Sequence, residues 1–178
     1  MTSEFDAAEF RTCYPVPWLM REHRQDWWFR IHSLPESKRY PTTTAEWAIL
    51  MQRHNELADA VLVPDSSCRL LYSQLAVAPF PSEKLPGIGW KPFRSVGEGE
   101  DRVDSWTASV VWRYDTFSDI IRMKADDQIA YVAFHSLRTD ALYCPYDGGA
   151  DVFSLNRRLL NTLRSRFSAW RSSHPLGL

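Results

Sequence analysis

The sequence has little cysteine and no long hydrophobic run. Its three cysteines, Cys13, Cys68 and Cys144, are far apart in a chain of 178 residues and form no Cys-x-x-Cys pair. This usage is typical of a reducing compartment, although one disulfide among the three stays an open alternative. The longest apolar run, residues 129–134, is far shorter than a membrane span requires. The first ten residues carry three acids and no apolar block. We therefore predict a cytoplasmic protein with no signal peptide and no membrane partner.

The sequence also lacks the common signatures of catalytic and ligand-binding sites. It has no Gly-rich loop followed by Lys-Ser/Thr, no His-Glu-x-x-His and no Gly-x-Ser-x-Gly. Of the five histidines, His54 lies on the apolar stripe of a predicted helix and His135 ends an apolar strand, so both are predicted to be core residues. His23, His32 and His174 have no cysteine or carboxylate at the spacing of a zinc site, so we expect no structural metal and no cofactor. Nucleic-acid-binding domains are usually basic, whereas this chain has a net charge of -1, so no nucleic-acid partner is expected. These absences argue against an enzyme, and no catalytic residue is predicted.

Charge of one sign is missing from the end of the chain. From residue 152 onward there is no acidic residue, and the basic ones are Arg157, Arg158, Arg164, Arg166 and Arg171. Residues 1–151 therefore carry 16 basic and 22 acidic side chains, a net charge of -6. We interpret the arginines as a solvated helix face, partly paired with acids elsewhere, and keep phosphate binding as the alternative.

What the chain has in plenty is apolar and aromatic residues, at 44% and 13%, including eight tryptophans. This composition and length fit a single domain over residues 1–178. Alternating residues predict strands at 27–32 and 106–114, and further strands are expected at 69–77, 142–146 and 150–153. Residues 129–134 are apolar on both faces, which predicts a central strand. The last two form a hairpin across Asp147, Gly148 and Gly149, where residues that tolerate positive φ are expected.

Helical spacing and capping residues predict the helices. Thr43 and Glu46 fit a capping box before a helix over about residues 45–60. Thr116 and Asp119 fit the start of a short helix, and Ser154 fits the cap of a final helix over about residues 155–172. A further short helix is expected over residues 3–12. Together the elements predict an α+β fold, a mostly antiparallel sheet of about five or six strands with helices mainly on one face.

Residues 79–104 interrupt these patterns with four prolines and four glycines. A loop of this length in a compact domain is usually functional or disordered, so we predict a long irregular loop with a binding role. Tryptophan is a preferred anchor of protein interfaces, and exposed acids steer a basic partner. The predicted partner-binding residues are Trp90, Phe93, Glu98, Glu100, Asp101 and Asp104.

Asp147 and Asp151 are the sharpest acidic pair. Two carboxylates around a tight turn are suited to holding a hard cation or to acid–base chemistry. The structural alternative, which we favour, makes Asp147 a turn residue. Asp151 would then pair with Arg157 or Arg158, or accept backbone amides near the final helix. The Cys144 thiol shows no neighbouring His in the sequence, so a role as nucleophile is not predicted.

The C-terminal third resembles a family of uncharacterised bacterial domains. The resemblance rests on Cys144-Pro-Tyr-Asp-Gly-Gly-Ala-Asp-Val152, on a helix with Arg166, Phe167 and Trp170, and on the ending Ser-His-Pro-Leu-Gly-Leu178; Trp27-Trp-Phe-Arg-Ile31 is similar to an early strand of that family. Such a family supplies no catalytic residues. Small, acidic, Trp-rich bacterial domains of this type are often immunity proteins, so the resemblance implies a protein that neutralises a cognate secreted toxin. The alternatives are a metal-dependent hydrolase using Asp147 and Asp151, with His32 or His135 as a third ligand, and a regulatory subunit of another bacterial system.

Overall fold

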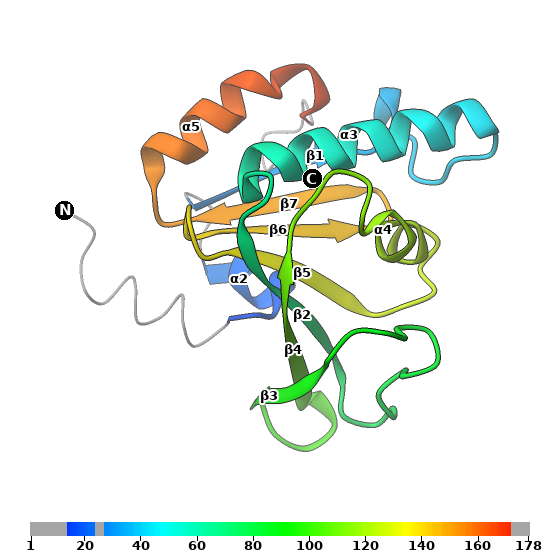
Figure 1. Cartoon of the computed structure of the whole chain (residues 1–178), viewed down its shortest axis with the longest axis vertical. Helices are drawn as coiled ribbons and strands as arrows, with labels where there is room; N and C mark the ends of the chain where they lie inside the picture. Colours follow the sequence, from blue (N-terminus) through cyan, green and yellow to red (C-terminus); the bar gives the residue numbers. More distant parts are fainter. Residues whose placement is uncertain (1–13, 24–26, 172–178) are drawn as a thin grey trace.

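Seven strands form a single sheet in which every neighbouring pair is antiparallel. The structure is a computed structural model that describes residues 14–23 and 27–171 (Figure 1). The strands are β1 (Trp28–His32), β2 (Ser67–Leu75), β3 (Lys91–Val96), β4 (Val103–Val111), β5 (Tyr131–Ser136), β6 (Ala141–Tyr146) and β7 (Gly149–Ser154). Their order is β1-β7-β6-β5-β2-β4-β3. The predicted α+β class is confirmed, whereas the predicted five or six strands were too few.

The described helices lie unequally on the two faces of the sheet. They are α2 (Pro17–His23), α3 (Thr44–Leu62), α4 (Ser118–Ala125) and α5 (Arg157–Arg166), with short 3-10 turns η2 (Pro35–Ser37), η3 (Gly99–Asp101) and η4 (Ser168–Trp170). Helices α3, α4 and α5 cover one face, and α2 lies against the other (Figure 1). The predicted helix over residues 3–12 lies outside the described residues. No described helix has both the length and the apolar character that a membrane crossing demands.

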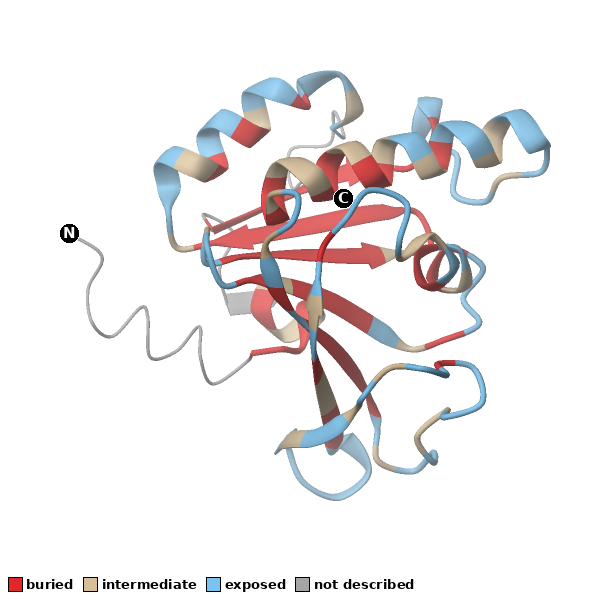
Figure 2. Ribbon diagram, viewed as in Figure 1, coloured by how far each residue is buried: buried red, intermediate tan, exposed pale blue. Residues whose placement is uncertain are grey.

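The core has two layers because the sheet buries both of its faces (Figure 2). The layer under α3, α4 and α5 includes Phe29, Leu57 and Trp112. The layer on the α2 side includes Met20 and Trp28. Phe29 and Trp28 are neighbours in β1 and enter different layers, as the alternation of residues 27–32 predicts. β5, predicted as a central strand because it is apolar on both faces, is the fourth of the seven strands.

Local sequence signals account for the best-predicted elements. The side chain of Thr43 accepts a hydrogen bond from the Glu46 amide, and the Glu46 side chain accepts one from the Thr43 amide, which confirms the capping box of α3. The β6–β7 hairpin is also confirmed, with Asp147 and Gly148 as its two-residue turn. Neither Gly148 in this turn nor Gly149 directly after it has positive φ, contrary to our expectation. Gly149 is required by space instead, because a Cβ there would lie 1.9 Å from the carbonyl oxygen of Ile31 in β1.

Residues 79–104 are more ordered than predicted, since they contain β3 and η3. β3 was missed because Pro92 and the surrounding glycines hide its alternation. Proline is tolerated on an edge strand, where one side of the backbone has no partner, and β3 pairs only with β4 and has a register shift between Pro92 and Arg94.

Two predicted helix caps and one helix end were wrong. Helix α4 begins after Phe117 without a side-chain cap, so Thr116 does not have the predicted role. Helix α5 is capped by Asn156, whose side-chain oxygen accepts from the Leu159 amide at 3.1 Å, because Ser154 is still part of β7. α5 ends at Arg166 rather than near residue 172, and η4 follows it.

Candidate functional site

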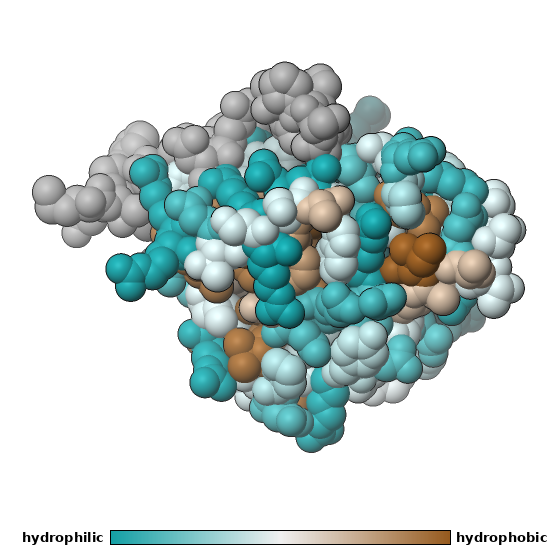
Figure 3. Space-filling view, turned by 90° about the horizontal axis from the view of Figure 1, so that it is seen from above, coloured by the Kyte–Doolittle hydropathy of each residue, from teal (hydrophilic) through white to brown (hydrophobic). Residues whose placement is uncertain are grey.

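A groove of about 780 Å³ lies at the end of the sheet where β2 finishes. Its walls are mostly apolar and come from α2, from the end of β2, from the β3–β4 region and from the start of β5. Its apolar side chains include Trp18, Leu19, Leu75, Val77, Val96 and Tyr131. By contrast, the face above α3 and α5 is mainly hydrophilic, with only small separate apolar patches (Figure 3). The groove therefore differs from that face in its apolar lining.

The two sides of the groove are held by packing between α2 and β5. Pro17 occupies the first position of α2, where its fixed φ favours the start of a helix. The next residue, Trp18, packs against the ring of Tyr131 with 4.2 Å between the centroids. On the other side, Leu75 ends β2 with 45% of its surface exposed, and Val77 follows with 74% exposed. These exposed aliphatic side chains lie beside the cavity rather than on an open convex surface.

One rim of the groove is acidic. It is formed by the connection between β3 and β4, in which Glu98, Glu100 and Asp101 are all exposed. Asp101 lines the groove directly. The turn depends on Gly97, which has a φ of 81° and whose added Cβ would lie 2.9 Å from the carbonyl oxygen of Asp101. This connection thus places the Asp101 carboxylate at an apolar hollow, with two more exposed acids close to it in the sequence.

The other three predicted partner-binding residues have structural roles. Trp90 packs edge-on against Phe80 and Tyr72 in the layer beneath the helices. Phe93 packs edge-on against Tyr14 on the opposite face of the sheet. Asp104 accepts hydrogen bonds from Ser95 at 2.7 Å and from Arg102 at 3.1 Å, and these bonds lower its pKa. The predicted set therefore does not form one surface.

Asp147 and Asp151 serve as counter-ions for arginines. Asp151 is buried and accepts from Arg30 at 2.8 and 3.2 Å and from Arg21 at 3.2 Å, instead of from the predicted arginines of the final helix. Burial raises the pKa of Asp151 to about 6, against the opposing effect of Arg30. Asp147 accepts from Arg39 at 2.7 Å and from the Tyr40 hydroxyl at 2.8 Å.

The hydrolase alternative requires a third metal ligand beside these carboxylates. Within residues 14–23 and 27–171, no three His, Cys, Asp or Glu side chains gather in a way that could hold a metal ion. Of the two histidines named for that role, His32 lines a pocket that Asp147 also lines. His135 is hydrogen-bonded to the Tyr14 hydroxyl at 3.0 Å and to Asp140 at 2.9 Å.

Two other side-chain groups have the residue types of nucleophilic sites but no access to substrate. The Ser33 hydroxyl lies 2.7 Å from Nε2 of His54, and both residues are fully buried. Cys144 is also buried, and burial raises the pKa of its thiol well above the usual value. A thiol that stays protonated is a poor nucleophile. We therefore assign structural roles to these buried side chains.

Sequence reasoning missed most of the groove. Residues 18–25 show no clear period, so the sequence does not predict α2 and does not mark Trp18 or Leu19 as site residues. The available signal was at the end of β2, where the apolar side chains of Leu75 and Val77 continue past the point at which the strand meets the proline-rich segment.

A comparison with known families gives a match. A family model described as a domain of unknown function, DUF3885, matches residues 16–175. The matched span contains every described helix and strand, and so both walls of the groove and its acidic rim. Comparisons with curated proteins and with solved structures gave no match.

Proposed function

The chain belongs to the DUF3885 family of domains of unknown function, and on that premise we propose that it is a non-enzymatic protein-binding domain. Its groove would receive an apolar side chain of a partner protein, and basic residues of the partner would surround that side chain. The observation that supports this proposal is the joining of an apolar hollow of about 780 Å³ to a rim of exposed acids.

Two features of the site support the proposal, its apolar lining and its exposed acids. Apolar side chains that line a hollow and remain exposed mark binding surfaces, and binding energy concentrates where an anchor residue fills such a pocket. Glu98, Glu100 and Asp101 lie at the edge, where charges mainly increase the association rate and exclude partners of like charge. A basic partner with an apolar anchor satisfies both parts of the site.

In its most concrete form the proposal is an immunity protein that binds and neutralises a cognate secreted bacterial toxin. Support comes from the type of protein, namely a small domain with an acidic body, many tryptophans and no catalytic signature in its sequence. A toxin that acts on nucleic acid or on an anionic surface would itself be basic, which agrees with the acidic rim.

The test uses a matched pair of variants at opposite ends of β2. Leu75→Glu adds a charge inside the groove. Leu137→Glu adds the same charge at a leucine that is similarly exposed, 56% against 45%, and whose amide bonds to the carbonyl of Ser67 at the other end of the strand. Affinity purification with mass spectrometry from the source cells should recover one partner with the wild type and with Leu137→Glu. Leu75→Glu should lose it.

Two outcomes would contradict the proposal. Equal recovery of the partner by both variants would exclude the groove as the binding site. If the recovered partner is toxic when expressed, the wild type and Leu137→Glu should protect cells from it, while Leu75→Glu should not. Protection by all three proteins would exclude the groove as the toxin-binding site. A deletion strain that competes with its kin as well as the wild type would refute the immunity role.

A further inference from the structure

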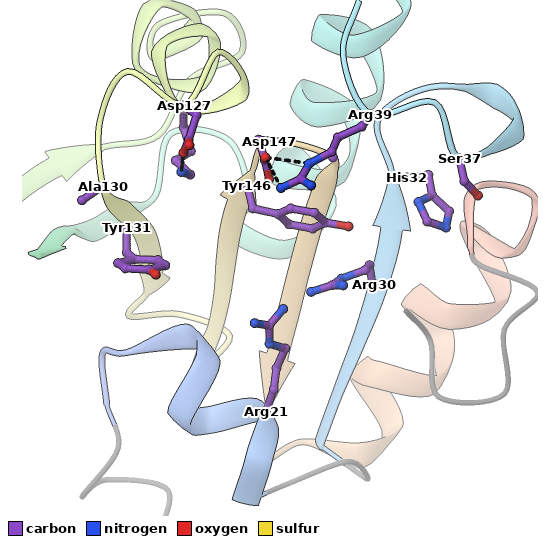
Figure 4. Close-up of a pocket in the computed structure, with 12 residues that line it drawn as sticks. Arg21, Arg30, His32, Ser37, Arg39, Asp127, Ala130, Tyr131, Tyr146 and Asp147 are labelled. Carbon is purple, nitrogen blue, oxygen red and sulfur yellow. Dashed lines mark hydrogen bonds and ion pairs between the residues drawn. The ribbon is translucent and has the colours of Figure 1, made fainter. Parts of the chain in front are cut away.

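A second pocket, of about 680 Å³, lies on the α2 side of the sheet beside the β6–β7 turn. Four cationic side chains line it, each from a different part of the chain: Arg21 from α2, Arg30 from β1, Arg39 from the β1–α3 connection and Lys124 from α4. In the close-up, Arg21 and Arg30 extend toward the space in front of β6 and β7, and Arg39 reaches it from the rim (Figure 4). Arginines that converge from distant segments on one hollow are typical of a site for an oxyanion.

Carboxylates hold these cations in position without using all of their donors. A guanidinium has five N–H groups. Asp151 accepts from two of them on Arg30 and from one on Arg21, and Asp147 accepts from Arg39. Arg30 is also fixed by the ring of Tyr146, which lies 4.3 Å from its central carbon. The guanidinium groups are therefore held in position before a ligand binds, so binding does not have to offset the entropy lost in ordering them.

The charge of the pocket selects the ligand. Asp127 accepts from Lys124 at 2.8 Å, so the four cations face three carboxylates and leave one net positive charge. His32 adds none at neutral pH, because burial and the nearby Arg30 and Arg53 lower its pKa. One negative charge balances this pocket, which favours a carboxylate over a phosphate that carries nearly two.

The pocket adjoins the apolar groove at two shared residues. Ala130 and Tyr131 line both hollows, so a ligand whose charged end lies among the arginines has an apolar wall beside it. We propose that this second pocket binds a carboxylate carried on an apolar body. The source of the carboxylate is either a small organic acid or the C-terminal residue of a peptide. This site goes beyond the protein-binding groove and does not depend on it.

The experiment measures binding of defined probes to the full chain by calorimetry and by NMR of the arginine Nε–H groups. The carboxylates are benzoate and N-acetylphenylalanine, and their uncharged controls are benzamide and N-acetylphenylalaninamide. Saturable binding of the carboxylates, with at least about tenfold weaker binding of the amides, is expected from the loss of charge-assisted hydrogen bonds. Absence of saturable carboxylate binding, or inorganic phosphate that binds as tightly as benzoate, would overturn the proposal.

A matched pair of arginine variants locates the site. Arg39 and Arg113 are similarly exposed, at 63% and 66% of their side chains, and each pairs with an aspartate. Arg39→Gln should weaken benzoate binding about tenfold, since it removes the net charge of the pocket, whereas Arg113→Gln should leave it unchanged. Equal effects of the two variants would refute the assignment.

The probes also separate the two sources and the two proposals. If a short peptide ending in phenylalanine binds more tightly than benzoate and loses this binding when its C-terminus is amidated, the carboxylate comes from a peptide. Equal binding of benzoate and the peptide assigns the pocket to a small acid. Leu75→Glu, which is designed to block the groove, should keep benzoate binding, so failure of one proposal leaves the other measurable.

Discussion

His54 shows how burial sets the chemistry of a single residue. Its ring lies 2.6 Å from the Tyr143 hydroxyl and 2.7 Å from the Ser33 hydroxyl, so both nitrogens have a partner. A neutral imidazole suits this arrangement, because it donates from one nitrogen and accepts at the other, and each hydroxyl can do either. Complete burial disfavours the charged ring and lowers its pKa to about 3. The position on the apolar stripe of α3 predicted a core histidine, and the contacts give the physical reason.

This residue should make the protein less stable in mild acid. Between pH 7 and pH 5 the unfolded chain protonates His54, with an ordinary pKa of about 6.5, while the folded protein does not. The stabilisation is thus present above the unfolded pKa and is lost as the pH falls. We expect the wild type to lose about 2 kcal/mol of unfolding free energy relative to His54→Gln between pH 7 and pH 5.

Urea unfolding of both proteins at the two pH values measures this difference. Comparison with the variant cancels other titrating groups, including Asp151, whose raised pKa acts in the opposite direction. A difference that does not change between pH 7 and pH 5 would mean that the ring takes up a proton in the folded protein as it does in the unfolded chain. An NMR titration of the His54 ring in the wild type provides an independent reading, with no shift expected down to pH 5.

At the scale of elements, the β6–β7 hairpin depends on a close approach between strands. Gly149 pairs with His32 of β1 and with Tyr146 of β6, so it is enclosed on both sides. The adjacent Gly148 lies in the turn, and the nearest atom to an added Cβ there is a ring carbon of Tyr146 at 3.1 Å, which is a side chain able to shift. Two neighbouring glycines therefore have different reasons to be present.

Alanine at the two positions should separate these reasons. Gly149→Ala would bring a Cβ to 1.9 Å from the Ile31 carbonyl oxygen, so β1 has to move, and we expect a loss of about 3 kcal/mol or more. Gly148→Ala meets only side-chain atoms, of Tyr146 and Arg39, and should cost about 1 kcal/mol or less. Thermal and urea unfolding measure both. Similar losses for the two variants would show that β1 is not docked against β7 at this point.

The elements also show what a sequence can predict. The capping box of α3, the two-sided apolar pattern of β5 and the Asp-Gly turn are all local signals, and each predicted its element correctly. β3 was not predicted, because an edge strand needs no regular alternation and tolerates Pro92. The pairing of the arginines with Asp151 was not predicted for another reason. Arg30 and Asp151 are 121 residues apart, and Arg21 and Asp151 are 130 apart, so their pairing depends on the strand order. Only one of the six predicted partner-binding residues, Asp101, lines the groove.

For the whole molecule, the fold converts an uneven sequence charge into a spatial one. The basic helix α5 packs on β7 and β1, at one edge of the sheet, and the acidic turn between β3 and β4 lies at the other edge. The acidic stretch and the basic helix are therefore separated instead of lying side by side. Some of the basic charge is also used in the fold, since Arg164 donates to the Trp28 carbonyl at 2.7 Å. The molecule has a net charge of only -1, yet it presents a local acidic field at the groove.

This local field should control how fast a basic partner binds. The double variant Glu100→Gln with Asp101→Asn removes two charges from the rim while leaving the apolar walls in place. At low salt we expect the association rate to fall about fourfold, the Coulomb estimate for two unit charges about 10 Å from a partner charge in water. The dissociation rate should change little, because rim charges act mainly on encounter. Stopped-flow binding at two ionic strengths measures both rates. At 0.15 M salt the effect should shrink, since the screening length falls to about 8 Å.

The matched control, Asp119→Asn with Asp126→Asn, removes two exposed charges at α4. If this control slows association equally, the overall charge, and not the acidic rim, directs the partner.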